Sequence, residues 1–287
     1  MKNVKFRLFS AGLVLAMALT FSCSSGSDDD GGGGKEVIAT MSYTQVIYDA
    51  SGAVSSTSTA RYEYEYDSKG NQAKQITYGA DGNRGYVYEF EYDSRGNRTK
   101  YTLYGADGNR AGVYEFEYDS KGNQTKQISY GADGTITGRA EYEYDSRGNR
   151  TKQISYGADG NRGVVLEYEY DSRGNQTKQI LYSADGTIAS TSRAEYDCNS
   201  DGSFCTYSSY NSTGEISGTG EIRYTTINSK KLTASQTSIS SNGSGTRLEY
   251  EYDSKGNTTK YTYYSRQAGG SYVKYSEVTY TYTYKTI

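Results

Sequence analysis

The sequence predicts an all-β protein, an antiparallel meander of about nine β-hairpin repeats. A Tyr-Asp pair recurs with a 26-residue period, at positions 66, 92, 118, 144, 170 and 196. A fixed period of this length is the mark of a repeat architecture. Within each repeat, aromatic and acidic residues alternate with a period of two, which is typical of a half-buried strand. The chain has no proline, so no central strand loses a backbone donor.

The first 22 residues are typical of a signal peptide rather than of the fold. Lys2, Lys5 and Arg7 precede an apolar run, 8–21, that is too short to span a bilayer as a helix. The run ends in Leu-Thr-Phe-Ser-Cys, which resembles a bacterial lipobox and predicts acylation of Cys23. The alternative is an ordinary secretory signal with an incidental cysteine.

Residues 23–36 are predicted to form a flexible tether. The stretch SSGSDDDGGGG at 24–34 can bury nothing that would offset the entropy of ordering it. Its acidic cluster, 28–30, resembles the surface-export signal of Bacteroidota-type lipoproteins. That resemblance implies an outer-membrane protein, anchored through lipid on Cys23 and exposed on the cell surface. The alternative is a solvated linker.

Charge excludes one class of partner. Without Lys2, Lys5 and Arg7 of the signal peptide, the 31 basic residues become 28, against 34 acidic residues, so the net charge is −6. No basic patch or stripe points to nucleic acid. We therefore expect a mildly acidic, soluble ectodomain with no nucleic-acid partner and no second apolar stretch able to span a membrane.

Each repeat should hold two strands of different character. In the first strand Tyr62, Tyr64 and Tyr66 face one way, and Glu63 and Glu65 face the other. The second strand is shorter and more polar, as in Gln-Ala-Lys-Gln-Ile-Thr-Tyr at 72–78. Regular repeats should cover 37–196, degenerate repeats 197–246, and a final repeat with a capping strand 247–287.

The turns at 67–71 and 79–83 each suit a three-residue hairpin loop with glycine in the left-handed position. Such loops place Tyr64 opposite Lys74 and Tyr62 opposite Ile76. We then expect every Tyr and Ile on one face, and Glu, Gln, Thr and Ser on the other. A shift of one residue would oppose Tyr to Gln and Thr and mix the faces, and it is rejected for that reason.

About eighteen strands are too many for a flat sheet. An open, twisted sheet rarely exceeds about ten strands without curling or splitting. The sheet should therefore curl into a spiral, close, or fold over on itself. The final strand keeps the Tyr/Thr alternation at 278–284 but has no turn after it, so we expect a terminal cap.

The units resemble Rhs/YD repeats, whose hallmark is a Tyr-Asp pair, a turn and a Gly-Asn-Arg-Thr run. Here the hallmark reads YDSRGNRT at 92–99 and again at 144–151. The resemblance implies a curled or spiral β-sheet, which in large members winds into a shell around a C-terminal toxin. This chain has about seven recognisable units and ends in a Tyr/Thr strand. Only the repeat architecture is therefore carried over, and no catalytic residue.

Catalysis is not expected. The chain has no histidine, and its carboxylates lie in repeating rows or in turns. Glu63 and Glu65 should belong to a solvated face, and Asp67 and Asp81 should cap their own turns. The alternative for the aspartates is calcium binding, although no EF-hand motif is present. We predict no enzyme, no cofactor and no metal.

Cys198 and Cys205 flank a turn in DCNSDGSFC and could lie opposite each other across a hairpin. Outside the cytoplasm a disulfide is permitted, and we expect one. The alternative is two free, buried thiols.

The tyrosines are the candidate binding residues. Tyrosine is large, stiff and amphipathic, and it is favoured at recognition surfaces. The candidate aromatic ladder comprises Tyr64, Tyr66, Tyr88, Tyr92, Tyr114, Tyr118, Tyr142, Tyr144, Tyr168 and Tyr170. The alternative is that these rings form the core of the sheet, in which case the non-repeating stretch 197–246 is the place for a specific site.

These patterns favour a surface lipoprotein for binding or adhesion, with an extracellular glycan or a surface protein as partner. Many weak sites in repeated units would give avidity. Two alternatives stay open: a structural stalk or envelope scaffold, and an Rhs-related toxin-associated module.

Overall fold

A computed structural model describes residues 35–211 and 213–287, which form one compact unit. Cys23, the signal peptide and most of the tether lie outside the described residues. The described part contains eighteen β-strands and no helix, so it has no helix that could cross a membrane. The strands are β1 Glu36–Tyr48, β2 Val54–Tyr66, β3 Gln72–Tyr78, β4 Arg84–Tyr92, β5 Arg98–Tyr104, β6 Arg110–Tyr118, β7 Gln124–Gly131, β8 Ile136–Tyr144, β9 Arg150–Gly157, β10 Arg162–Tyr170, β11 Gln176–Tyr182, β12 Ile188–Cys198, β13 Phe204–Tyr210, β14 Ile216–Ile227, β15 Lys230–Ser240, β16 Gly245–Tyr252, β17 Thr258–Arg266 and β18 Val273–Thr286.

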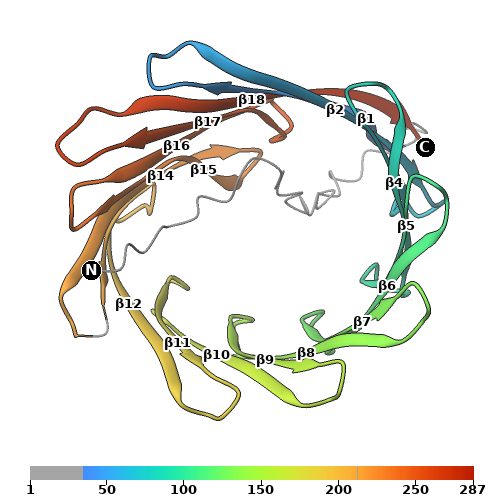
Figure 1. Cartoon of the computed structure of the whole chain (residues 1–287), viewed down its shortest axis with the longest axis horizontal. Helices are drawn as coiled ribbons and strands as arrows, with labels where there is room; N and C mark the ends of the chain where they lie inside the picture. Colours follow the sequence, from blue (N-terminus) through green and yellow to red (C-terminus); the bar gives the residue numbers. More distant parts are fainter. Residues whose placement is uncertain (1–34, 212) are drawn as a thin grey trace, which may run out of the picture. The chain divides into compact units, whose positions relative to one another are not determined.

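The sheet is a closed barrel. Each strand pairs antiparallel with its neighbours in sequence, and β18 pairs with β1 (Figure 1). The predicted all-β meander of hairpin repeats is confirmed. The spiral implied by the Rhs/YD resemblance does not form, and the predicted terminal cap is wrong because β18 pairs on both sides. Closure leaves no strand with unpaired backbone groups along an edge.

The seam between β1 and β18 carries the most buried apolar cluster of the described chain. Ile38, Met41 and Tyr64 form its centre, with Tyr280 and Tyr282 packed against it. Across the seam Tyr43 lies opposite Tyr280. Burial of these side chains favours closure over an open sheet, since apolar area removed from water stabilises by roughly 25 cal/mol per Å².

The predicted three-residue loops are present. In the turn after β6, the N–H of Asp119 donates to the carbonyl oxygen of Asn123 (2.9 Å), and the N–H of Gly122 donates to that of Asp119 (3.1 Å). Gly122 has φ +86°, the left-handed conformation in which a side chain would be strained. The same pattern recurs at each Tyr-Asp turn from 67–71 to 171–175 and at 253–257.

The predicted register is wrong by one residue, because a β-bulge follows each of these turns. Tyr66 pairs with Gln72, as a three-residue loop requires, but Glu65 then pairs with Lys74. Ala73 is the extra residue. Tyr64 therefore lies opposite Gln75, which is the pairing that the sequence argument rejected. A bulge has no strong sequence signal, so loop length alone did not determine the register.

The shifted register sorts the side chains into two faces over β2–β11. The tyrosine face carries Tyr64, Gln75, Tyr88, Phe90, Tyr101, Leu103, Tyr114, Phe116, Gln127, Ser129, Ala140, Tyr142, Gln153, Ser155, Leu166, Tyr168, Gln179 and Leu181. The charged face carries the Glu/Lys rows together with Ile76, Val87 and their equivalents. Gln and Ser share a face with Tyr, and Ile shares a face with Glu, contrary to the expectation.

We assign the tyrosine face to the inner side of the barrel. Burial is the leading cause of the raised pKa of Tyr88 and Tyr142 on this face. On the charged face, a hydrogen bond to a glutamate is the leading cause of the raised pKa of Tyr130 and Tyr182. Side chains converge and lose water on the concave side of a closed sheet. A barrel of this strand number is also too wide for side chains to fill.

The degenerate repeats belong to the same sheet. β13, β14 and β15 continue the meander without a break in pairing. The hairpin between β12 and β13 has a longer loop and no bulge, and its strands end in the pair Cys198 and Cys205. Asn228 and Ser229 both have positive φ and make a two-residue turn between β14 and β15.

The two ends of the barrel differ. One end, the Tyr-Asp rim, holds the turns at 67–71, 93–97, 119–123, 145–149 and 171–175, and both Lys35 and Ile287 lie beside Gly70 there. The other end, the far rim, holds the turns at 49–53, 79–83, 105–109, 131–135, 157–161 and 183–187. Exposed apolar residues gather in the strands that follow far-rim turns: Val54, Tyr86, Ile136, Val164, Ile188, Ile216 and Val273. The end away from the termini is thus the more apolar one.

Engineered cysteines test the shifted register. We expect the pair Lys74→Cys with Glu89→Cys to oxidise to a disulfide, because these residues lie directly opposite each other on β3 and β4. The pair Lys74→Cys with Tyr88→Cys, which the unshifted register would oppose, should stay reduced. Peptide mass spectrometry under non-reducing conditions reads the outcome. A disulfide only in the second pair would contradict the bulge.

Candidate functional site

The candidate tyrosine ladder divides into two sets with different surroundings. In four of the Tyr-Asp pairs the tyrosine hydroxyl donates to a backbone carbonyl twenty residues earlier, at 2.7–2.8 Å: Tyr92 to Gln72, Tyr118 to Arg98, Tyr144 to Gln124 and Tyr170 to Arg150. Each such bond ties a strand to its neighbour at the Tyr-Asp rim. Tyr66, at the equivalent position of the first unit, packs against the seam cluster. These rings serve the sheet rather than a ligand.

The other set lies further along the inner face. Tyr88, Tyr114, Tyr142 and Tyr168 are half-buried, so part of each ring reaches solvent. Tyr64, by contrast, is only 8% exposed and belongs to the seam cluster. The four half-buried rings are therefore the part of the predicted ladder that a ligand could contact.

An aromatic cluster surrounds Arg98 on β5. Tyr101 and Tyr114 stack with their ring centroids 4.4 Å apart, and Tyr88 and Phe90 stack at 6.3 Å. The Arg98 guanidinium carbon lies 5.3–5.5 Å from the ring centroids of Phe90, Tyr101 and Phe116. Cation–π attraction of this kind is worth roughly 0.5–2 kcal/mol, more where water is excluded.

A second cluster repeats the arrangement two units later. The Arg150 guanidinium carbon on β9 lies 5.4 Å from the ring centroids of both Tyr142 and Tyr168. The residue after the Gly-Asn of the Tyr-Asp turn is Arg in these two units, Gln in three others (Gln72, Gln124 and Gln176) and Thr258 in the last. The sequence analysis did not single out Arg98 or Arg150. The change between Arg and Gln at this position is visible in the sequence. It points to a site only once the structure shows that aromatic rings surround the two arginines.

Most carboxylates of the charged face have a partner. The Nζ of Lys126 on β7 lies 2.8 Å from Oε1 of Glu117 on β6. The Nζ of Lys178 on β11 lies 2.8 Å from Oε1 of Glu169 on β10. Tyr130 donates to Glu115 at 2.9 Å. A hydrogen bond from Arg61 is the leading cause of the lowered pKa of Glu63. These carboxyl groups are paired with cations or hydroxyl groups, which suits a solvated surface.

Two shallow depressions lie on this charged face. The larger, about 590 Å³, is lined by Lys74, Glu89, Glu91 and Lys100 among others. The smaller, about 230 Å³, is lined by Glu143, Lys152, Glu167 and Lys178 among others. Both are shallow gaps between long side chains, most of which form cross-strand ion pairs, such as Lys74 with Glu89 and Lys152 with Glu167.

The turn aspartates accept bonds from their own turns. Oδ1 of Asp119 accepts from the N–H groups of Lys121 (2.9 Å) and Asn123 (2.8 Å), and Oδ2 accepts from the Asn123 side-chain amide (2.8 Å). The hydrogen bond from Asn123 is the leading cause of its lowered pKa. Within residues 35–211 and 213–287, no cluster of three or more Cys, Asp or Glu side chains could hold a metal ion.

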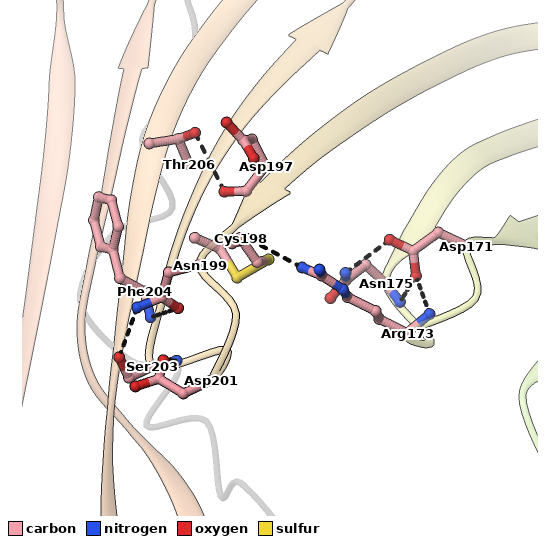
Figure 2. Close-up of a disulfide and its surroundings, with 11 residues drawn as sticks. Asp171, Arg173, Asn175, Asp197, Cys198, Asn199, Asp201, Ser203, Phe204 and Thr206 are labelled. Carbon is pink, nitrogen blue, oxygen red and sulfur yellow. Dashed lines mark hydrogen bonds between the residues drawn. A yellow bond between two sulfur atoms is a disulfide. The ribbon is translucent and has the colours of Figure 1, made fainter.

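The disulfide expected from the sequence joins Cys198 and Cys205, with a Cα–Cα distance of 4.0 Å (Figure 2). Arg173, from the turn after β10, donates to the carbonyl oxygen of Cys198 at 3.2 Å. Arg95 and Arg147 reach the carbonyls of the next turn in the same way. The disulfide therefore closes the longer 199–204 turn, which lies in a row of turn-to-turn contacts along the Tyr-Asp rim.

Comparisons with known proteins assign no family. No family model and no curated protein matches the chain. Among solved structures, a porin-like protein from Bacteroides uniformis is 13% identical, with 86% of this chain and 96% of that chain covered and a TM-score of 0.45. The TcdB2-TccC3 structure is 14% identical and has a TM-score of 0.31; 77% of this chain aligns with 15% of that one.

A putative outer membrane lipoprotein-sorting protein domain from Vibrio parahaemolyticus is 12% identical, with 90% of this chain and 87% of that chain covered and a TM-score of 0.20. TM-scores this low assign neither a family nor a function. The Rhs/YD resemblance therefore stays a prediction from the repeat sequence.

Alkaline titration tests the enclosure of the tyrosine face. Burial raises the pKa of Tyr62 and Tyr261 to about 12. Unfolded tyrosines lose their protons near pH 10, so between about pH 10 and 12 the unfolded state binds fewer protons than the native state. We expect the stability contributed by these rings to be complete below pH 10 and to fall as the pH rises toward 12.

Tyrosinate absorbance and urea denaturation at several pH values would measure this effect. A single tyrosine transition near pH 10, with unchanged urea midpoints across it, would contradict an enclosed face.

Proposed function

We propose that this chain is a non-catalytic, lipid-anchored outer-membrane protein that binds a glycan chain at the cell surface through the inner tyrosine face of its barrel. The observation that carries the proposal is the row of half-buried rings Tyr88, Tyr114, Tyr142 and Tyr168. Flat rings of this kind stack on the apolar faces of sugars, and the neighbouring Gln75, Gln127 and Gln153 supply amide donors and acceptors.

Rigidity supports this proposal. The Tyr-Asp turns are held by their own aspartates, and Arg95 and Arg147 bridge each turn to the next. The hydroxyl bonds of Tyr118 and Tyr144 connect neighbouring strands. A preformed surface loses little conformational freedom on binding, so more of the stacking energy appears as affinity.

The two ends of the described chain lie at one rim of the barrel. The N–H of Ile287 donates to the carbonyl oxygen of Lys35 at 2.9 Å, so the described chain begins and ends at the Tyr-Asp rim. A lipid on Cys23 would hold the barrel from that end. The far rim, with its exposed Ile136, Ile188 and Ile216, would then be the end presented away from the anchor.

The second candidate is an envelope scaffold or spacer with no ligand. One observation favours it: most charges of the described charged face pair with each other, from Lys74–Glu89 to Lys178–Glu169. A scaffold needs only such a surface. It does not need the half-buried rings of the inner face. Removal of these rings would therefore abolish glycan binding under the first proposal and leave a scaffold function unchanged.

Ring removal with a matched control tests glycan binding. The full chain, purified with its lipid in detergent, would be applied to a broad glycan array. We expect the triple variant Tyr88→Leu, Tyr142→Leu, Tyr168→Leu to lose about tenfold or more in affinity, because stacking needs flat rings and each ring contributes roughly 0.5–1.5 kcal/mol.

The control is Tyr130→Leu, Tyr156→Leu, Tyr182→Leu on the charged face, where the rings bind glutamates. Its affinity should match that of the unmodified chain. Absence of glycan binding by the unmodified chain would overturn the proposal and leave the scaffold.

Substitution of the acylated residue tests the anchor. We expect Cys23→Ser to move the protein from the membrane fraction to the soluble fraction, because the described barrel keeps its charged face outward and has no other membrane attachment in this proposal. Immunoblots of fractionated cells and a mass measurement of the mature N-terminus read the result. Equal membrane retention of both forms would exclude lipid on Cys23 as the anchor.

A further inference from the structure

We infer that Arg98 and Arg150 are anion-recognition points on the tyrosine face, so that the glycan this face binds is acidic and carries carboxylate or sulfate groups. The inference rests on the proposed function and names the ligand class of the same site. Both arginines lie on the inner face at the same position of the repeat, two units apart.

No carboxylate forms a described ion pair with Arg98 or Arg150. On the tyrosine face of β3–β11, none of the paired residues is Asp or Glu; the glutamates are all on the other face. The described contacts of the Arg98 and Arg150 side chains are to aromatic rings. The turn aspartates Asp67 and Asp93 act on the same tyrosines as Arg98, but their oxygens already accept hydrogen bonds within their own turns. A positive charge among rings, with no carboxylate in direct contact, is left for a ligand to neutralise.

Two arginines of the charged face differ from Arg98 in having a carboxylate nearby. Arg98, Arg139 and Arg247 each have a solvent-shielded Nε without a hydrogen bond. However, the Nε of Arg139 lies 3.4 Å from Glu141, and that of Arg247 lies 3.1 Å from Glu249. No such carboxylate is described for Arg98. A carboxylate thus compensates the Nε of Arg139 and of Arg247 on the outer face, whereas Arg98 has none among the described residues; Arg266, at the end of β17, also has no described carboxylate partner.

Three rings lie within 5.5 Å of the Arg98 guanidinium carbon, and two lie 5.4 Å from that of Arg150. A planar fork held against aromatic faces is the arrangement that recognises carboxylate and sulfate groups by paired hydrogen bonds. Beside each fork are rings that can stack on the sugar carrying the anion, Tyr114 near Arg98 and Tyr142 near Arg150.

The distance between the two arginines limits which ligands can contact both. Arg98 begins β5 and Arg150 begins β9, four strands further round the barrel. At about 4.8 Å between neighbouring strands, the two lie about 19 Å apart along the sheet. Between them the equivalent position is Gln124, which is polar but uncharged. A chain with several acidic sugars could contact both arginines at once, whereas a single acidic sugar could contact only one.

The overall charge of the chain, −3, does not favour anions. Long-range attraction therefore cannot explain binding of an acidic glycan, and recognition must come from the two local sites. This makes the inference specific: loss of two charges on the inner face should matter, and loss of two charges on the outer face should not.

The experiment compares acidic and neutral forms of the same polymers, with the full chain purified with its lipid in detergent. Polygalacturonate and its methyl-esterified form test carboxylate, and dextran sulfate and dextran test sulfate. The test variant is Arg98→Gln with Arg150→Gln, which reproduces the residue of the neighbouring units. The control is Arg139→Gln with Arg247→Gln, which removes the same charge from the outer face.

We expect the test variant to lose about tenfold in affinity per arginine for an acidic polymer, as for loss of a hydrogen bond to a charged group, and to keep its affinity for neutral polymers within about twofold. The control should bind like the unmodified chain. Circular dichroism spectra and urea midpoints equal to those of the unmodified chain would show that both variants keep the fold.

Equal affinity of the unmodified chain for acidic and neutral forms, or equal losses in test and control variants, would overturn the acidic-glycan inference while the proposed glycan-binding function stands. Binding of galacturonate monomer as tightly as the polymer would overturn the two-point spacing. No binding of any polymer on the array or here would overturn both the function and the inference.

Discussion

One extra residue per pair of strands is the constraint on which the rest of the structure depends. All neighbouring strands except β12–β13 and β15–β16 show a register shift. The shift decides that Tyr64 lies beside Gln75 and that Ile76 lies beside Glu63. It also adds bend and twist at each hairpin, which a wide sheet needs to close. The composition of both faces and the closure of the barrel thus have one origin.

The barrel is stabilised by repetition more than by a packed core. Few side chains are fully buried, and Val87 and Val165 are the largest of them in the described chain. Stability instead comes from many equivalent small terms: cross-strand pairs worth roughly 0.2–1 kcal/mol each, self-capped turns, and the hydroxyl bonds of Tyr92 and its equivalents. The only concentrated apolar cluster described is at the seam around Met41, where the two ends of the chain must meet.

The two faces of the sheet differ in how their charges are compensated. The outer face pairs most of its charges with a neighbour, as Lys126 does with Glu117. The inner face holds rings and amides with two uncompensated arginines. Gln72, Gln124 and Gln176 show that a neutral residue satisfies the same position of the repeat. The arginines are thus dispensable for the fold, which directs attention to them as ligand contacts.

The sequence by itself determined the strands, the turns and the pairing of Cys198 with Cys205, because period-two alternation, glycine at left-handed positions and facing cysteines are local patterns. It also predicted that Asp67 caps its own turn, as the bonds to Lys69 and Asn71 show. It mispaired Tyr64 with Lys74 and missed Arg98 as a site residue. Tertiary structure decided both, because the bulge at Ala73 depends on how neighbouring strands bend together, and the rings around Arg98 come from three strands. Closure through β1 and β18 was likewise decided by contacts between segments at opposite ends of the chain, which no local pattern encodes.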